Sequence, residues 1–163
     1  EDDFYVFSHP PKNKDLDLHE FLPNPLVAIA QQDHPLAGKK NIPLQTFLDQ
    51  PFLNRENGSG TRHAIEHHFE QMDAEPNIRM TIESNEAIKH AVMSGLGVSV
   101  LSSHTLAFGG STGLVKLNVE HLPIMTKWYL ANLQAKQLSV VARTFLEYVA
   151  DYGWGDMFGH LNE

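Results

Sequence analysis

The feature that most constrains the fold of this chain is the alternation of short apolar runs with segments in which apolar residues recur three and four positions apart. The short runs predict strands and the three-and-four spacing predicts helices. Strands that alternate with helices indicate an α/β fold with a mostly parallel sheet. The expected strands are residues 4–7, 26–30, 51–54, 79–82, 98–101, 114–119 and 127–133. The expected helices are residues 44–48, a segment directly after Thr61, residues 85–93 and residues 139–152.

The last expected helix, residues 139–152, has a clear start and an apolar face. Ser139 is a good N-cap residue, because its hydroxyl can accept a hydrogen bond from an N–H group of the first turn. The residues expected to face inward are Val141, Ala142, Phe145, Leu146 and Val149. Three glycines argue against a regular helix in residues 153–163, whose aromatic residues suggest that this tail docks on another surface.

Charge and composition exclude several classes of protein. The 163 residues include 12 basic and 20 acidic side chains and no basic stripe, so we expect this chain by itself not to bind DNA. The hydrophobic content of 42% is that of an ordinary soluble domain, and no apolar run is long enough to span a membrane. The absence of Cys excludes disulfides, Cys-rich zinc sites and a Cys nucleophile, and it fits a cytoplasmic location.

The most informative segment for function is Asn57 to Arg62, where an expected strand leads through Gly-Ser-Gly-Thr into a helix. Unpaired backbone N–H groups and the positive end of the helix dipole make such a start an anion site. Ser59 and Thr61 add hydroxyl donors, and Arg62, with Arg55 as a further candidate, supplies a countercharge. The alternative is a well-capped helix after a flexible turn, with no ligand.

A second segment, Ser84-Asn85-Glu86, is also predicted to form a polar helix start, because it ends one expected strand and opens the next helix. Two polar helix starts at neighbouring strand ends would converge on one cleft, which is where ligands bind in open α/β sheets. The alternative is that Ser84 or Asn85 only caps its helix.

Other patterns fall short of a catalytic, cofactor or metal motif. No Lys follows Gly60, so the Gly-Ser-Gly turn is not a phosphate-binding P-loop, and it lacks the spacing of a nucleophile elbow. Residues 95–99 precede an expected strand, so their glycines fit a helix-to-strand turn and not a dinucleotide site. His63 and His67 are four apart, but no further ligand completes a metal site, so we expect no metal and no cofactor.

Several stretches resemble the effector-binding domain of LysR-type transcriptional regulators, in particular the branch that controls RuBisCO and inorganic-carbon genes. The resemblance rests on Glu56-Asn57-Gly58-Ser59-Gly60-Thr61-Arg62 and on Ser84-Asn85-Glu86-Ala87-Ile88-Lys89-His90-Ala91-Val92. It extends to residues 24–27, 34–37, 95–102 and 138–146, and covers the chain from about Phe4 to Val149. Around residues 4–7 the sequence is most similar to cyanobacterial members.

This resemblance implies a two-lobed, periplasmic-binding-protein-like (type 2) fold with the effector between the lobes. One lobe would comprise residues 1–24 and 134–163, and the other residues 25–133. Family members have a further strand–helix–strand unit ahead of the segment at Phe4, with a Ser/Thr-rich loop that lines the cleft. That unit is missing from this sequence.

The resemblance also implies which residues line the cleft and what they bind. The family's effectors in this branch are phosphorylated or carboxylated metabolites, among them ribulose bisphosphate, 2-phosphoglycolate and 2-oxoglutarate. By position, the effector-binding residues would be Asn57, Gly58, Ser59, Gly60, Thr61, Arg62, Ser84, Asn85, Glu86, Ser102, Ser8 and His9.

The expected function is therefore a metabolite sensor and not an enzyme. The family implies a homodimer through this domain, or a tetramer of the full-length protein, and DNA contact only through an N-terminal helix-turn-helix that this sequence lacks. Two alternatives are an extracytoplasmic solute-binding protein of the same fold and a phosphate-handling enzyme, for which the sequence offers no convergent acid–base pair.

Overall fold

The computed structural model describes residues 3–12, 14–107 and 112–151, and the chain divides into two compact units. The terminal unit comprises residues 1–24 and 126–163, and the central unit comprises residues 25–125. The sequence predicts the second boundary at residues 133 and 134, eight residues later along the chain.

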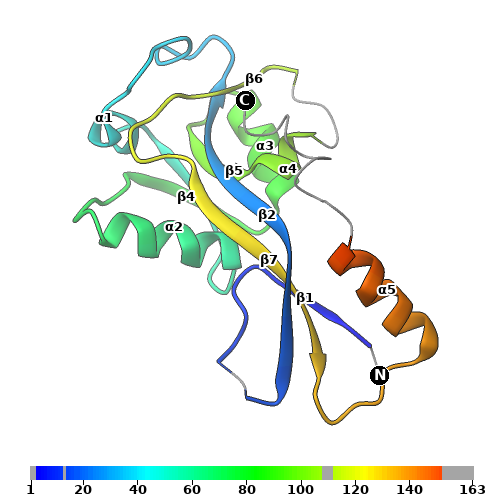
Figure 1. Cartoon of the computed structure of the whole chain (residues 1–163). Helices are drawn as coiled ribbons and strands as arrows, with labels where there is room; N and C mark the ends of the chain where they lie inside the picture. Colours follow the sequence, from blue (N-terminus) through cyan, green and yellow to red (C-terminus); the bar gives the residue numbers. More distant parts are fainter. Residues whose placement is uncertain (1–2, 13, 108–111, 152–163) are drawn as a thin grey trace. The chain divides into compact units, whose positions relative to one another are not determined.

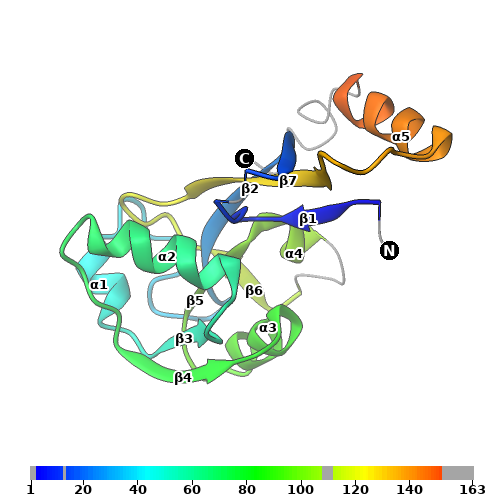
Figure 2. The same ribbon diagram turned by 90° about the horizontal axis from the view of Figure 1, so that it is seen from below.

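The central unit is built on a mixed set of strands. β2 (Leu16–Gln31) enters this unit at Pro25, and its last part pairs antiparallel with β5 (Ser99–Ser102) and with β6 (Leu114–Lys116). β3 (Phe52–Arg55) and β4 (Ile78–Ile82) lie side by side and are parallel (Figure 2). A parallel bridge between Phe52 and Val98 places β3 next to the start of β5.

Four helices belong to the central unit: α1 (Leu44–Leu48), α2 (Gly60–Glu70), α3 (Asn85–Met93) and α4 (Ser103–Ala107). In Figure 1, α1 and α2 lie on one side of β2 and β5, and α3 and α4 lie on the other. Helices on both sides bury both faces of the strands, which explains why these strands are continuous apolar runs in the sequence.

The two faces of the strands carry separate hydrophobic cores, because successive side chains of a strand point to opposite faces. On the side of α1 and α2, the core contains Leu26, Ala28, Ala30, Phe52, Val98 and Val100, packed against Phe47, Ile65 and Phe69. On the side of α3, it contains Val27, Ile29, Leu53 and Leu101, packed against Ile88 and Val92. The expected α/β class is confirmed.

Three expectations for the strands and helices are wrong. The strands are not mostly parallel, because β2 runs antiparallel to β5 and β6. β2 begins at Leu16 and not at residue 26, and the strand continues through Pro23, which is exposed, and Pro25. The short helix α4 has too few residues to show a period and was not expected.

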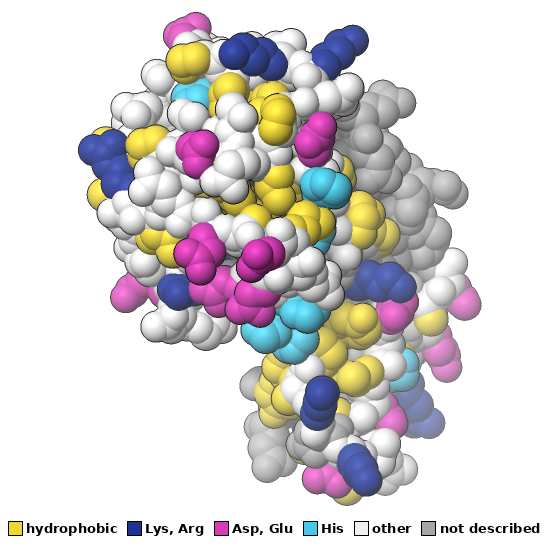
Figure 3. All heavy atoms as spheres, turned by 90° about the vertical axis from the view of Figure 1, so that its left-hand side faces the viewer, with side chains coloured by type: hydrophobic (Ala, Val, Ile, Leu, Met, Phe, Trp, Pro, Cys, Tyr) yellow, Lys and Arg dark blue, Asp and Glu magenta, His cyan; other side chains and the backbone are white. Residues whose placement is uncertain are grey.

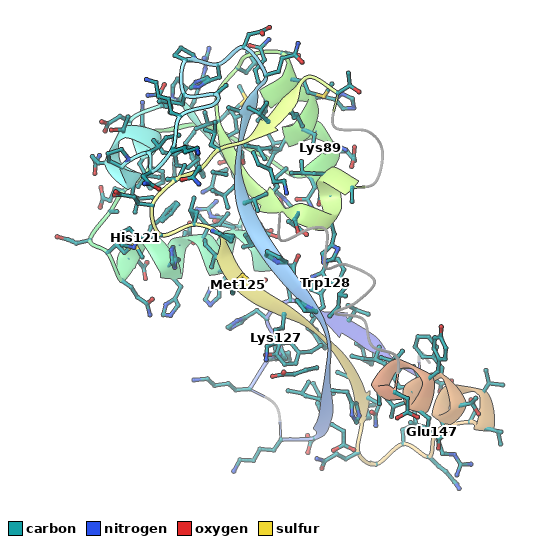
Figure 4. The ribbon with its side chains drawn as sticks, turned by 45° about the horizontal axis from the view of Figure 1, so that its top comes forward. Lys89, His121, Met125, Lys127, Trp128 and Glu147 are labelled. Carbon is teal, nitrogen blue, oxygen red and sulfur yellow. The ribbon has the colours of Figure 1, made fainter. Side chains whose placement is uncertain are left out.

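The terminal unit contains β1 (Tyr5–Phe7), the first part of β2, most of β7 (Ile124–Leu133) and α5 (Val140–Asp151). β1 is antiparallel to β7, and β7 lies next to β2 in the strand order. Figure 4 shows Lys127 and Trp128 on β7 and Glu147 on α5. Lys127 forms an ion pair with Glu20 of β2.

The start of α5 is as predicted, but its apolar face is only partly so. The Ser139 hydroxyl accepts a hydrogen bond from the Ala142 N–H at 3.1 Å, which confirms the cap. Ala142 and Val149 are buried, whereas Val141 is 79% exposed and Phe145 48% exposed. Leu146, between these two positions, is half-buried. The predicted apolar face is therefore confirmed at Ala142, Leu146 and Val149 and wrong at Val141 and Phe145. Residues 152–163 lie outside the described residues.

Candidate functional site

Three strands of the central unit end at the same edge, and each leads into a helix. β3 and β4 are parallel, β5 is parallel to β3 at the Phe52–Val98 bridge, and the helices that follow them are α2, α3 and α4. We call the segments that follow these strand ends the strand-end edge: residues 55–62, 84–89 and 102–105. This topology brings together the predicted effector residues of the central unit.

The first segment of this edge is the start of α2. Ser59 is its N-cap, and the Ser59 hydroxyl accepts a hydrogen bond from the Arg62 N–H at 3.4 Å. Gly58 has φ +89°, a left-handed conformation that favours glycine and lets the chain turn from β3 into the helix. Ser59, predicted to be a hydroxyl donor, thus caps the helix, as in the alternative of a well-capped helix. Gly60 and Thr61 occupy the first turn, where N–H groups have no acceptor within the helix.

The second segment is the start of α3, which has the same design. Ser84 is the N-cap, and its hydroxyl accepts a hydrogen bond from the Ala87 N–H at 3.4 Å. Glu86 lies in the first turn, where a carboxylate is stabilised by the positive end of the helix dipole. The two caps fix where both helices begin.

Arg55 joins these two helix starts. Its guanidinium donates to both carboxylate oxygens of Glu56, at 2.7 Å from Nε and 2.8 Å from Nη2. Nη1 donates to the side-chain oxygen of Asn85, thirty residues away at the start of α3. The Arg55 side chain is 14% exposed, so one largely buried cation holds the loop before α2 and the first residue of α3 together.

Two further cations lie at the strand-end edge, and both are paired with a glutamate close in sequence. Arg62 Nε is 2.6 Å from Glu66, and Arg62 Nη1 donates to the Arg55 carbonyl at 3.1 Å. Lys89, which Figure 4 labels beside α3 and α4, has a side chain only 2% exposed. Its ammonium group is 3.2 Å from Glu86 and donates to the Thr105 carbonyl of α4 at 3.2 Å.

The ion pair with Arg55 also sets the protonation of Glu56. The hydrogen bond from Arg55 lowers the pKa of the Glu56 carboxyl below its ordinary value of 4.5, and a hydrogen bond from its own backbone and the charges of Arg55 and Arg62 act in the same direction. Partial desolvation opposes these effects without reversing them. Glu56 is therefore ionised at neutral pH, and it neutralises Arg55.

The third segment is the junction of β5 and α4, where consecutive polar residues are buried. The Ser102 hydroxyl accepts a hydrogen bond from the His104 N–H at 3.2 Å. Ser103 is 2% exposed, and its hydroxyl has no hydrogen-bond partner among the described residues. Buried hydroxyls are normally paired, so Ser103 is an exception within this edge.

Sequence reasoning missed several of these residues. Arg55 was only a candidate countercharge, and Glu56, Glu66, Lys89 and Ser103 were not assigned to the site. One signal was available for Lys89, since it is adjacent to Ile88 and three positions before Val92, two of the apolar residues of this helix. No pattern in the sequence indicates that Arg55 pairs with Asn85.

Ser8 and His9, the remaining predicted effector residues, belong to the terminal unit. They directly follow β1, with Ser8 half-buried and His9 exposed. Of the predicted effector-binding residues, the strand-end edge contains those of the central unit and not Ser8 or His9.

The histidines of α2 lie on a different surface of the central unit. Figure 3 shows acidic side chains gathered beside histidines on the side that carries α1 and α2, with Lys and Arg scattered over it. His67 contacts Gln71, and His68 contacts the His121 carbonyl. Among the described residues, no group of three His, Asp or Glu side chains is arranged to hold a metal ion.

The helices in the described part of the chain were also compared with the length and apolar character of a membrane span, and none of them meets both requirements.

Comparison with known sequences assigns the family of this domain. Residues 1–154 match the LysR substrate binding domain, so the chain belongs to this family. The predicted resemblance to LysR-type regulators is confirmed.

Individual relatives identify the branch. The chain is 47% identical over 149 residues to the HTH-type transcriptional activator CmpR of Synechocystis, covering 91% of this chain and 49% of CmpR. It is 43% identical over 148 residues to a RuBisCO operon transcriptional regulator of Allochromatium vinosum, covering 90% of this chain and 49% of that protein. The chain thus spans about half the length of these relatives, and the predicted likeness to a cyanobacterial carbon regulator is confirmed.

Solved structures confirm the two-lobed type 2 fold. The regulatory domain of CcmR from Synechocystis, solved in complex with 2-PG, superposes with a TM-score of 0.85 at 49% identity, covering 92% of this chain and 73% of that one. The effector binding domain of QuiR, solved with shikimate, has a TM-score of 0.81 at 22% identity, covering 93% of this chain and 71% of that one, and shows the same fold. These relatives are regulators, which disfavours a solute-binding protein.

Proposed function

We propose that this chain is the effector-sensing domain of a LysR-type transcriptional regulator that controls CO2-fixation or inorganic-carbon-uptake genes. Its ligand is a small phosphorylated or carboxylated metabolite, bound at the strand-end edge. The candidate ligands are ribulose bisphosphate, 2-phosphoglycolate and 2-oxoglutarate.

One observation carries this proposal: Arg55 holds two capped helix starts together at one edge. Each helix start offers N–H groups and a positive dipole end, which favour an anion. The guanidinium of Arg55 suits carboxylate and phosphate geometry because its donors form a rigid fork. The bound 2-PG of the CcmR domain, a relative at 49% identity, agrees with an anionic ligand.

Calorimetry on the full-length protein that carries this chain tests the proposal. We expect saturable binding of at least one of the three candidate anions, and a lower affinity in Thr61→Ala, which removes a hydroxyl from the first turn of α2. Thr46→Ala is the matched control, because Thr46 is an exposed helical residue of α1, away from the edge. Equal affinities for wild type and Thr61→Ala would contradict the assignment of the α2 start.

The sensing mechanism requires two states of the protein with different affinities for the ligand. In the full-length regulator, ligand binding shifts this equilibrium and changes how the attached DNA-binding domains sit on a promoter. Promoter DNA is bound through an N-terminal helix-turn-helix, and the protein acts in the cytoplasm without catalysing a reaction.

We further propose that the domain forms a homodimer, in which β4 contributes to the interface. β4 pairs with β3 on one side, and its Ile78 and Met80 are 49% and 38% exposed. An exposed strand with apolar side chains is a surface that proteins normally cover.

A further inference from the structure

Arg55 is the central cation of the strand-end edge, and each of its three nitrogens donates one hydrogen bond within the protein. Nε and Nη2 bind the two oxygens of Glu56, and Nη1 binds Asn85. An anion can therefore reach the fork formed by Nε and Nη2 only by replacing the Glu56 carboxylate. Binding at this fork is an exchange of one anion for another.

The neighbourhood of Glu56 permits such an exchange. The Glu56 side chain is 31% exposed, more than twice the exposure of Arg55, so it can rotate into water without moving the backbone. Arg55 would keep its place, because Asn85 and the contact of Arg62 with the Arg55 carbonyl hold it independently of Glu56.

We propose that Glu56 is an internal competitor for the effector: its carboxylate occupies the Arg55 guanidinium and is displaced when a phosphorylated effector binds. The inference rests on the proposed function of the strand-end edge as an anion site. It adds a residue that determines the affinity for anionic ligands.

A phosphate group is better suited to this exchange than a simple carboxylate. A ligand with one carboxylate makes the same two hydrogen bonds that Glu56 already makes, and it gains little at Arg55 by replacing it. A phosphate group has more acceptor oxygens and more charge, and those that do not face Arg55 can accept hydrogen bonds from the N–H groups of a helix start. The free energy of displacing Glu56 is the same for both kinds of ligand, so the phosphorylated effector is the one that recovers it.

The test compares 2-phosphoglycolate with glycolate, a pair that differs by the phosphate. Calorimetry on the full-length wild-type protein and on Glu56→Gln gives the four dissociation constants. We expect Glu56→Gln to bind 2-phosphoglycolate about tenfold more tightly, because the competing charge-assisted hydrogen bonds are weakened. Glycolate must displace the same carboxylate to reach Arg55, so its affinity should rise by a similar factor.

Glu70→Gln is the matched control, because it removes one negative charge from an exposed position on α2, the helix that follows the Glu56 loop. It should leave both affinities unchanged. A similar gain in Glu70→Gln would mean that net charge, and not competition at Arg55, causes the effect, and it would overturn the inference.

A second measurement uses the unmutated protein, so it does not depend on how Glu56→Gln folds. In NMR spectra, the side-chain carboxyl resonance of Glu56 and the Nε–H resonance of Arg55 should both shift when 2-phosphoglycolate is added. An unshifted Glu56 carboxyl in the saturated complex would show that the ion pair persists, and it would overturn the inference.

The two proposals fail in different ways. If wild type binds 2-phosphoglycolate but Glu56→Gln binds it no more tightly, Glu56 is a structural partner of Arg55 and only the inference is lost. If wild type binds none of the candidate anions, the function proposed for the strand-end edge is wrong, and the inference is overturned with it.

Discussion

Gly97 lies so close to Pro51 that a Cβ atom at residue 97 would be 2.2 Å from the Pro51 carbonyl oxygen. The same oxygen accepts a hydrogen bond from the Val98 N–H at 2.8 Å, and the Leu53 N–H donates to the Val98 carbonyl at 2.9 Å. These contacts join β3 to the start of β5. Because α2 follows β3 and α4 follows β5, this join also positions two segments of the strand-end edge.

Gly97→Ala should destabilise the protein. Backbone cannot move aside as a flexible side chain can, so the added methyl group must break the hydrogen bond between Val98 and Pro51 or shift a strand. We expect a loss of about 2 kcal/mol in the free energy of unfolding, measured by urea denaturation. Leu96→Ala, at the exposed neighbouring position, is the control and should change stability little. Equal stability of Gly97→Ala and wild type would contradict the close approach.

Ala substitution of two buried serines, at the start of β5 and directly after it, should change the stability of the protein in opposite directions. The Ser99 hydroxyl donates to the Leu53 carbonyl at 2.7 Å, so Ser99→Ala leaves that carbonyl with one partner fewer. We expect it to lose about 1 kcal/mol of stability. Ser103→Ala removes a buried hydroxyl that has no partner among the described residues, and we expect a gain of about 1 kcal/mol. Thermal unfolding of both variants is the measurement, and a loss in Ser103→Ala would show that its hydroxyl is paired in solution.

The ion pair of Glu56 should make stability depend on pH. Its pKa is lowered in the folded protein, so the folded state gains stability from ionised Glu56 above the ordinary value of 4.5. This contribution is lost as the pH falls through the lowered pKa. The stability difference between wild type and Glu56→Gln should therefore be largest near neutral pH and shrink below 4.5.

Urea denaturation over a series of pH values measures this difference, with Glu70→Gln again as the control for a removed charge. A difference that grows as the pH falls would contradict the lowered pKa of Glu56.

Met80→Asp should dissociate the proposed dimer. Met80 is 38% exposed on β4, and a carboxylate there is costly to bury against a second copy. Because the side chain is accessible in the monomer, we expect the stability of the isolated subunit to change little. Sedimentation of the full-length protein should show a lower oligomeric state for Met80→Asp than for wild type. Glu75→Gln, which precedes β4, is the control, and unchanged sedimentation of Met80→Asp would exclude β4 from the interface.

The sequence by itself determined the features that depend on neighbours along the chain. The bounds of α1 and α3 agree with those expected, and Ser59, Ser84 and Ser139 are all caps. Gly95 ends α3 with φ +75°, as its place in a helix-to-strand turn predicted. Each of these features requires hydrogen bonds that span only a few residues, so the residue types and their spacing are sufficient to predict it.

Tertiary structure decided what the strand-end edge contains. Arg55 meets Asn85 across thirty residues, and Lys89 reaches Thr105 across 16. The antiparallel course of β2 and the buried face of α5 are likewise set by elements distant in the sequence. Propensity and periodicity report only on local hydrogen bonding and on one buried face, so the partner of a buried cation is fixed only when the strands are placed side by side.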